Sequence, residues 1–265
     1  MSVGYVQFVS TVGDVRVALP DYVSRPLARS PLVLVAAQLT FEEIGPGVLH
    51  AQAREIQGAV GSRWTRLQAQ SMVTTTATPG GAVSDPRRAA YRLSSGDAQW
   101  SALLSPDSVA VETRVYAGWS EMRDTILSFA AAVASVFDPA SEIRLGLRYI
   151  DQVVLPRGRA GWAGLIPDSL LGITLDAQFA SAVLASEQQV VLALDDQSRC
   201  LFRHGRLADQ DGQPGKYLLD YDVYRENAGP FASDLLAEGI DTLHSYVGQL
   251  FRASISDELY AELGR

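Results

Sequence analysis

The feature that most constrains this chain is the stretch EIRLGLRYIDQVVLP, residues 142–156, in which apolar residues alternate with polar or charged ones. A period of two residues is typical of a β-strand, whose successive side chains point to opposite faces of a sheet. One face then carries Arg144 and Arg148 on either side of Gly146, while the opposite, apolar face carries Asp151. The stretch therefore predicts a strand whose charges belong either to a working site or to the scaffold.

The composition is that of a globular protein. Of 265 residues, 47% are hydrophobic and 20% are charged, and no uninterrupted apolar run approaches the roughly 18 residues that a membrane-spanning helix needs. The opening residues MSVGYVQFVS lack the pattern of a secretion signal, and Cys200 is the only cysteine, so no intrachain disulfide forms. We therefore expect a cytoplasmic protein with no membrane partner.

Turn signals and hydrophobic periodicity divide the chain into strands and helices. They predict a hairpin around Val12-Gly13-Asp14, an amphipathic helix over 119–137, strands over 179–194, 199–207 and 217–225, and a long helix with Ser233 as its N-cap. Tight turns between strands favour antiparallel pairing. The predicted fold class is therefore α+β, with largely antiparallel sheets and long amphipathic helices packed on one face.

Two α+β halves are expected. Residues 1–156 form an N-terminal half, a β-hairpin followed by the order β-α-β-β-β-α-β, and residues 157–265 form a C-terminal half of strands followed by helices. Because both halves place strands before an amphipathic helix, an internal duplication into two similar α+β halves stays open.

The histidines and the cysteine do not form a recognisable reactive group. His50, His204 and His244 have no second metal ligand at the usual spacing, so solvated or capping roles are favoured. Cys200 and His204 share a strand face but stand roughly 13 Å apart, too far for a hydrogen bond. A buried, inert thiol is the favoured interpretation, and the sequence predicts neither a metal nor a cofactor.

The charge balance opposes binding to nucleic acid. There are 22 basic and 30 acidic residues, a formal net charge of −8, whereas nucleic-acid binding is driven by basic surfaces that release counterions. The loop PRGRAGWAG, residues 156–164, is rich in glycine and arginine. It has neither the G-K-S/T sequence of a P-loop nor the G-x-G-x-x-G spacing of a dinucleotide-binding loop. An ordinary connection is favoured there over an anion site.

A second alternating stretch, KYLLDYDVYRE, places Asp220, Asp222 and Glu226 on one face. Carboxylates two residues apart on a strand bind a divalent cation or act as an acid and a base, and they also form ordinary solvated faces. If this strand shares a sheet with residues 142–156, Arg144 and Arg148 pair with Asp220 or Asp222 as scaffold, and Gly146 leaves room for them. These charged residues are the candidates for contacting a ligand or partner.

Several segments carry a resemblance to a known family. They are RSPLVLVAAQLTFEE, GWSEMRDTILSF, RLGLRYIDQVVLP and, as the most specific, LLDYDVYRENAGPFASDLLAEGIDTLHSYVGQLFRASISDEL. Together they resemble a sporadically distributed, uncharacterised bacterial family of about this length, over residues 19–263. No catalytic residues are established for that family. Its patchy distribution implies mobile or defence-associated genes, by association only.

Two functions follow as hypotheses. The first is a non-enzymatic, cytoplasmic protein-interaction module within a mobile defence or toxin–antitoxin-like system, whose partner is another protein encoded nearby; a homo-oligomer is also compatible with the sequence. The alternative is a metal- or phosphate-dependent enzyme that uses Asp220, Asp222 and Glu226 with Arg144 and Arg148. The lack of a recognisable nucleotide, metal or nucleophile motif favours the first.

Overall fold

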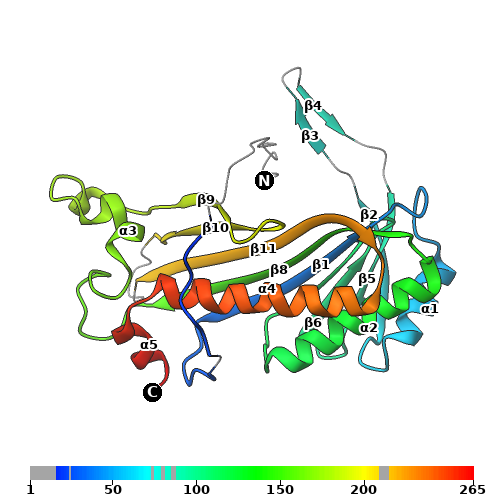
Figure 1. Cartoon of the computed structure of the whole chain (residues 1–265), viewed down its shortest axis with the longest axis horizontal. Coiled ribbons are helices and arrows are strands. Elements are labelled where there is room, and N and C mark those ends of the chain that lie inside the picture. Colours follow the sequence, from blue (N-terminus) through cyan, green and yellow to red (C-terminus); the bar gives the residue numbers. More distant parts are fainter. Residues whose placement is uncertain (1–15, 24, 73–74, 79–80, 85–87, 209–214) are drawn as a thin grey trace.

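A large antiparallel sheet organises the molecule (Figure 1). The computed structural model describes residues 16–23, 25–72, 75–78, 81–84, 88–208 and 215–265. Within these residues, nine strands form one sheet in the order β2-β5-β6-β7-β1-β8-β11-β10-β9, and β3 and β4 form a separate ribbon. The strands are β1 (Leu32–Phe41), β2 (Arg66–Met72), β3 (Thr75–Thr78), β4 (Gly81–Ser84), β5 (Arg88–Ser94), β6 (Trp100–Leu104), β7 (Ser108–Thr113), β8 (Ser141–Val154), β9 (Gln188–Ala193), β10 (Ser198–Arg206) and β11 (Lys216–Pro230).

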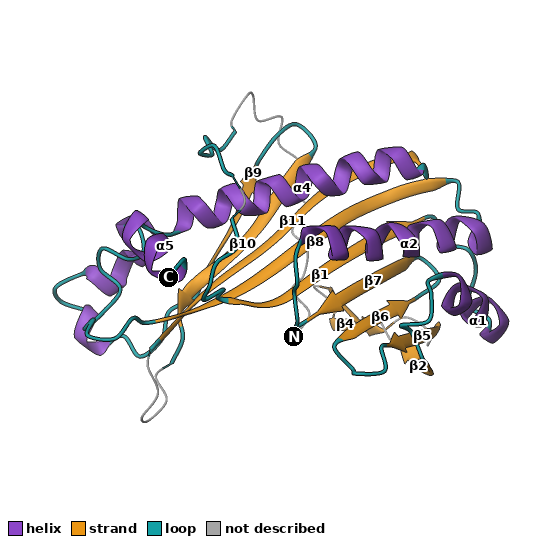
Figure 2. Cartoon of the chain, turned by 90° about the horizontal axis from the view of Figure 1, so that it is seen from below, coloured by secondary structure: helices purple, strands orange, loops and turns teal. Residues whose placement is uncertain are grey.

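The two longest helices lie on the same face of this sheet (Figure 2). The helical segments are α1 (His50–Ala59), α2 (Trp119–Phe137), α3 (Asp168–Leu171), the 3-10 turns η1 (Gly172–Leu175) and η2 (Ala180–Ala182), α4 (Ser233–Ser254) and α5 (Asp257–Leu263). Among the described residues, no helix combines the length and apolar character that crossing a membrane requires. The α+β class and the large antiparallel sheet agree with the sequence.

The core lies between the sheet and these two helices. On β8 and β11, alternate residues such as Leu147 and Tyr221 are buried on the helix side, where α4 contributes residues such as Ile240 and Leu243. β8 and β11 come from the two expected halves and are hydrogen-bonded neighbours over most of their length. One continuous sheet therefore runs through both halves.

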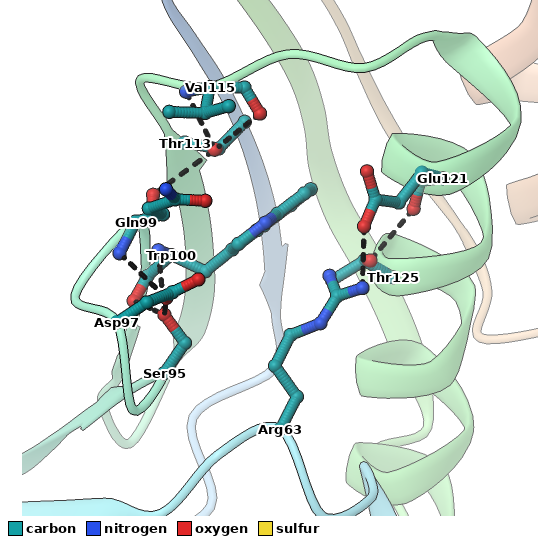
Figure 3. Close-up of polar contacts among 9 residues, drawn as sticks. All are labelled: Arg63, Ser95, Asp97, Gln99, Trp100, Thr113, Val115, Glu121 and Thr125. Carbon is teal, nitrogen blue, oxygen red and sulfur yellow. Dashed lines mark hydrogen bonds and ion pairs between the residues drawn. The ribbon is translucent and has the colours of Figure 1, made fainter.

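Several predicted details differ from the structure. Strand β6 was not expected; it follows a tight turn in which Asp97 Oδ1 accepts hydrogen bonds from Ser95 Oγ at 2.5 Å and from Gln99 N at 3.0 Å (Figure 3). The strand expected over 179–194 is shorter, because the Asp176 carboxylate accepts backbone hydrogen bonds that support a turn before η2. The hairpin predicted around Val12-Gly13-Asp14 lies outside the described residues.

The ends of the last two helices differ in how they are capped. Ser233 is the first helical residue of α4 and not its N-cap, a position that Ala232 occupies without a side-chain hydrogen bond. Ser256 is the N-cap of α5, because its hydroxyl oxygen accepts a hydrogen bond from Leu259 N at 3.2 Å. Capping at Ser256 fits the preference of serine for that position.

Candidate functional site

The charged residues predicted from the sequence meet on the face of β8 and β11 that is turned away from α4. Arg144 Nη2 donates to both oxygens of Asp222, at 3.2 and 3.4 Å, and its guanidinium lies 4.5 Å from the ring centroid of Tyr224. A Cβ atom on residue 146 would lie 2.6 Å from Arg144 Nη1. Gly146 therefore leaves the room that the guanidinium occupies, as the sequence predicted.

The second arginine forms the stronger pair. Arg148 Nε and Nη2 donate to the two oxygens of Asp220 at 2.8 and 2.7 Å, and Arg203 Nη1 from β10 donates to the same carboxylate at 3.3 Å. In the strand register Arg148 lies directly opposite Asp222, but its side chain reaches Asp220, two residues further along. Because Asp220 is only 3% exposed, these hydrogen bonds compensate the loss of its hydration.

The remaining acidic candidate does not join these pairs. Glu226 lies opposite Arg144 in the register and is exposed, and no ion pair to it is present among the described residues. Nor does any group of three or more His, Cys, Asp or Glu side chains in the described part of the chain have the arrangement to hold a metal ion. Arg144, Arg148, Asp220 and Asp222 are thus held in ion pairs between β8 and β11.

Asp151 of β8 lies on the opposite, helix-facing side of the sheet, and unlike Glu142 of the same strand, which pairs with Arg225, it has no ion pair among the described residues. Its side chain lines a pocket of about 320 Å³ but is only 5% exposed. None of the described residues donates a hydrogen bond to its carboxyl group. Burial raises the pKa of Asp151 to about 8, and the charge of Asp220 adds to that shift. Asp151 therefore differs from Asp220 and Asp222, whose carboxylates accept hydrogen bonds from arginines.

The pocket is lined by four parts of the chain: the connector before β1, the loop between β7 and α2, strand β8 and helix α4. Its principal side chains are Tyr22, Tyr116, Trp119, Tyr149, Asp151 and His244. The connector crosses α4 in Figure 1 (dark blue over orange). It approaches the helix closely, because a Cβ atom on residue 248 would lie 2.3 Å from the ring of Tyr22. Gly248 therefore lets the connector form one wall of the pocket.

The aromatic wall is fixed by hydrogen bonds. Tyr149 Oη donates to Tyr116 Oη at 3.1 Å and lies 3.2 Å from His244 Nδ1. Since the single Tyr149 proton is used on Tyr116, His244 is assigned as the donor to Tyr149. His244 also stacks on Trp119, with centroids 4.0 Å apart and an interplanar angle of 6°. The rings therefore stand in defined orientations around Asp151.

An ion pair supports the same wall from outside. Asp241, three residues before His244 on α4, accepts hydrogen bonds from Trp119 Nε1 at 3.0 Å and from Arg123 Nε and Nη2 at 2.8 and 2.9 Å. The Arg123 hydrogen bond lowers the pKa of Asp241. Burial lowers the pKa of His244 to about 4, although Asp241 acts in the opposite direction. His244 is therefore neutral at pH 7.

A larger hollow of about 600 Å³ lies beside the N-terminal part of α2. Figure 3 shows Arg63 between Trp100 and Glu121: its Nη2 donates to Glu121 Oε1 at 2.5 Å and its guanidinium lies 5.0 Å from the Trp100 ring centroid. Thr125 donates to the backbone oxygen of Glu121 at 2.7 Å. The arginine and the glutamate satisfy each other here, so the smaller pocket with the unpaired Asp151 is the better candidate site.

The structure revises the expectation for two histidines. His204 is 2% exposed, its Nδ1 lies 3.0 Å from Tyr217 Oη, and burial lowers its pKa. His244 is partly buried against Trp119. Neither is a solvated or capping side chain, because aromatic neighbours of each come from other strands or helices; His50 is exposed as expected. Cys200 is fully buried, and burial raises the pKa of its thiol.

Sequence reasoning missed the pocket but not its central residue. The position of Asp151 on an otherwise apolar strand face was visible in the alternation, and it implied either a partner or a special environment. The other walls come from segments far apart in sequence, and no local pattern links Tyr22 to Gly248.

Comparison with known proteins adds no assignment: no protein-family model matches the sequence, and no curated protein matches it significantly.

Proposed function

We propose that this chain is a non-enzymatic protein-interaction module that binds a protein partner at the β9 end of the sheet. The supporting observation is a concentration of exposed apolar side chains in one short region. Of the twelve large hydrophobic side chains exposed among the described residues, six lie within residues 173–191. We call this set the β9 surface, although Val190 and Val191 lie on opposite faces of β9 and the other members precede the strand: Ile173, Leu175, Phe179, Leu184, Val190 and Val191. Concentrated exposed apolar residues mark interaction sites.

The backbone of β9 supports the same proposal. β9 is the terminal strand of the sheet and pairs with β10 on its inner side. At one end of its outer edge, Val17 N donates to Ala193 O at 3.1 Å, so extended chain already pairs there. A partner that extends this pairing would add a strand to the sheet and place its side chains against the exposed apolar residues of β9.

The alternative enzyme has weaker support. A metal- or phosphate-dependent mechanism needs carboxylate oxygens or arginine N–H groups that are free to meet a substrate. The oxygens of Asp220 and Asp222 accept hydrogen bonds from arginines instead, and only Glu226 of the acidic candidates is exposed. The arrangement favours a structural role for these residues within an interaction module.

The resemblance to a sporadically distributed bacterial family extends the proposal. A partner encoded beside this chain, as in a mobile defence or toxin–antitoxin-like system in the cytoplasm, fits such a distribution.

The test is an affinity purification from the cells that produce the protein. Wild type is compared with a double variant, Leu184→Glu with Val191→Lys, and with Leu49→Glu, a control at the N-cap of α1 where the residue is 66% exposed. We expect wild type and the control to retain one stoichiometric protein that the double variant loses. The purified partner should then bind recombinant wild type but not the double variant. Equal retention by all three proteins would refute a role for the β9 surface.

A further inference from the structure

The starting observation is the state of Asp151. Buried carboxylates are usually paired or hydrogen-bonded, because removing a charge from water is costly. Asp220, on the other face of the same pair of strands, follows this rule with two arginines. Asp151 is buried to a similar degree, lines the pocket and accepts no hydrogen bond from the residues that the structure describes. Its carboxyl group is thus available to whatever enters the pocket.

The remaining lining is suited to a positive charge. Tyr22, Tyr116 and Trp119 line the pocket, and Phe251 of α4 adds an apolar residue to the lining. Aromatic rings attract cations through their quadrupoles, and aromatic cages combined with an acid recognise ammonium groups. The volume of about 320 Å³ lies at the lower end of the range for small-ligand sites. These dimensions suit a small organic molecule and not a peptide.

The charged and titratable groups around Asp151 do not pair with its carboxyl group, so a cationic ligand can take that place. Arg25, from the connector, lines the pocket but is exposed and makes no ion pair within the described residues. His244 from α4 is neutral above about pH 4. From the strands, Tyr149 and Tyr221 are buried and their pKa values are raised, and Asp220 adds negative charge. No cationic side chain among the described residues therefore forms an ion pair with Asp151.

We propose that this pocket binds a small organic cation, an alkylated or primary ammonium compound, with Asp151 as its counter-ion and the aromatic side chains as its cage. The inference rests on the pocket alone and does not depend on the interaction proposed for the β9 surface. An ionised Asp151 is needed to bind the cation strongly, and the free protein holds this group protonated at neutral pH because of burial. Binding therefore releases one proton from Asp151 to solvent.

This coupling gives the proposal a specific signature. Choline carries a fixed positive charge, and 3,3-dimethylbutan-1-ol is its neutral analogue of the same shape. Between pH 6 and pH 9, Asp151 passes from mostly protonated to mostly ionised, while His244 remains neutral and Tyr149 and Tyr116 retain their protons. Choline should bind on the order of 50-fold to 100-fold more tightly at pH 9 than at pH 6, a ratio set by the pKa of about 8.

The experiment is calorimetric titration of the full chain with choline, n-butylammonium and the neutral alcohol at both pH values. The variant is Asp151→Asn, which keeps the size of the side chain. Asp234→Asn, an exposed residue of α4, removes the same charge elsewhere and serves as the control. We expect both cations to bind wild type and the control at pH 9, the alcohol to bind at least tenfold more weakly, and Asp151→Asn to lose cation binding while remaining folded by circular dichroism.

Three results would overturn the proposal. One is the absence of binding by both cations at pH 9. Another is equal binding by choline and the neutral alcohol, which would identify an apolar cavity without charge recognition. The third is cation binding that Asp151→Asn leaves unchanged. If Asp151→Asn fails to fold, the pH dependence of choline binding to wild type decides the question alone, because a flat profile contradicts the required ionisation.

Discussion

Arg148 and Asp151 lie three residues apart on β8 and face opposite sides of the sheet, yet their charges are treated in different ways. Arg148 meets Asp220 through two short hydrogen bonds, and Arg203 joins the same carboxylate. Asp151 lies among aromatic and apolar side chains, and no described residue forms an ion pair or hydrogen bond with its carboxyl group. The charged residues that stand out in a strand sequence, such as Arg148, are therefore not necessarily the ones that contact a ligand. Paired charges hold the sheet together, whereas the unpaired buried acid marks the place for a ligand.

At a fixed pH, a large loss of stability is expected when the paired side is disrupted. Asp220→Asn would leave Arg148 and Arg203 without their carboxylate and should reduce the free energy of unfolding by about 3 kcal/mol. The loss is at the lower end for a buried ion pair, because the partly exposed Arg148 can be hydrated again in the variant. Asp222→Asn, whose pair with Arg144 is longer, should cost less. Urea denaturation measures both.

A double-mutant cycle sharpens the same point. Arg148→Ala and Asp220→Asn should be coupled by more than about 1 kcal/mol, whereas Arg148→Ala and Asp222→Asn should be close to additive. Strong coupling of Arg148 to Asp222, its partner in strand register, would contradict the diagonal pairing in the structure.

On the pocket side, Asp151 should make stability fall as pH rises. Its pKa is about 8 in the folded protein and near the ordinary value of 3.8 in the unfolded chain. Between these values the folded state binds more protons than the unfolded state, so the free energy of unfolding declines with pH, by at most about 1.4 kcal/mol per unit from this group. Asp151→Asn should remove the decline, so that the variant gains on wild type from pH 4 to pH 8. Parallel pH profiles for the two proteins would refute this.

His244 should change the free energy of unfolding with pH in the opposite direction, and at lower pH. Its pKa is lowered from 6.5 to about 4 in the folded protein, so the unfolded state binds more protons in this interval. The stability contributed by neutral His244 is present above about pH 6.5 and is lost as pH falls toward 4. His244→Gln should reduce this acid sensitivity, and His50→Gln, at an exposed site, should leave it intact. Thermal unfolding at pH 4.5 and pH 7 compares the three proteins.

A smaller effect tests the packing of the charged face. Gly146→Ala would place a methyl group 2.6 Å from Arg144 Nη1, and the flexible arginine should move aside at a cost of about 1 kcal/mol. Gly229→Ala on β11 meets no atom within 4 Å and should change stability less. Equal losses in urea denaturation would show that Arg144 does not occupy the space over Gly146.

The sequence predicted the charged face better than the pocket for a physical reason. Alternation along β8 and β11 assigns each side chain to a face, and opposite charges on facing strands then find each other, so the pairing of arginines with acids followed from local pattern. That Arg148 pairs with Asp220 and not with Asp222 did not follow from the sequence, because it depends on the side-chain conformation of the arginine across the strands. Large parts of the sheet also followed from periodicity, but β6 is short and its turn at Asp97 is fixed by side-chain hydrogen bonds.

The pocket depends on tertiary packing that no local pattern encodes. Tyr22 reaches α4 only because residue 248 is glycine, and the orientation of Tyr149 depends on Tyr116 and His244. The sequence did expose Asp151 as an acid on an apolar face. That no described residue donates a hydrogen bond to its carboxyl group became evident only from the positions of the neighbouring side chains in the structure.

The most direct test of the unpaired state of Asp151 is a carbon-13 NMR titration of its side-chain carboxyl group, assigned by comparison with Asp151→Asn and recorded with and without choline. We expect a pKa of about 8 for the free protein and a clear decrease when choline is bound, because a bound cation stabilises the ionised form. A pKa near the ordinary value of 3.8 in the free protein, unchanged by choline, would contradict both the unpaired burial of Asp151 and its role as a counter-ion.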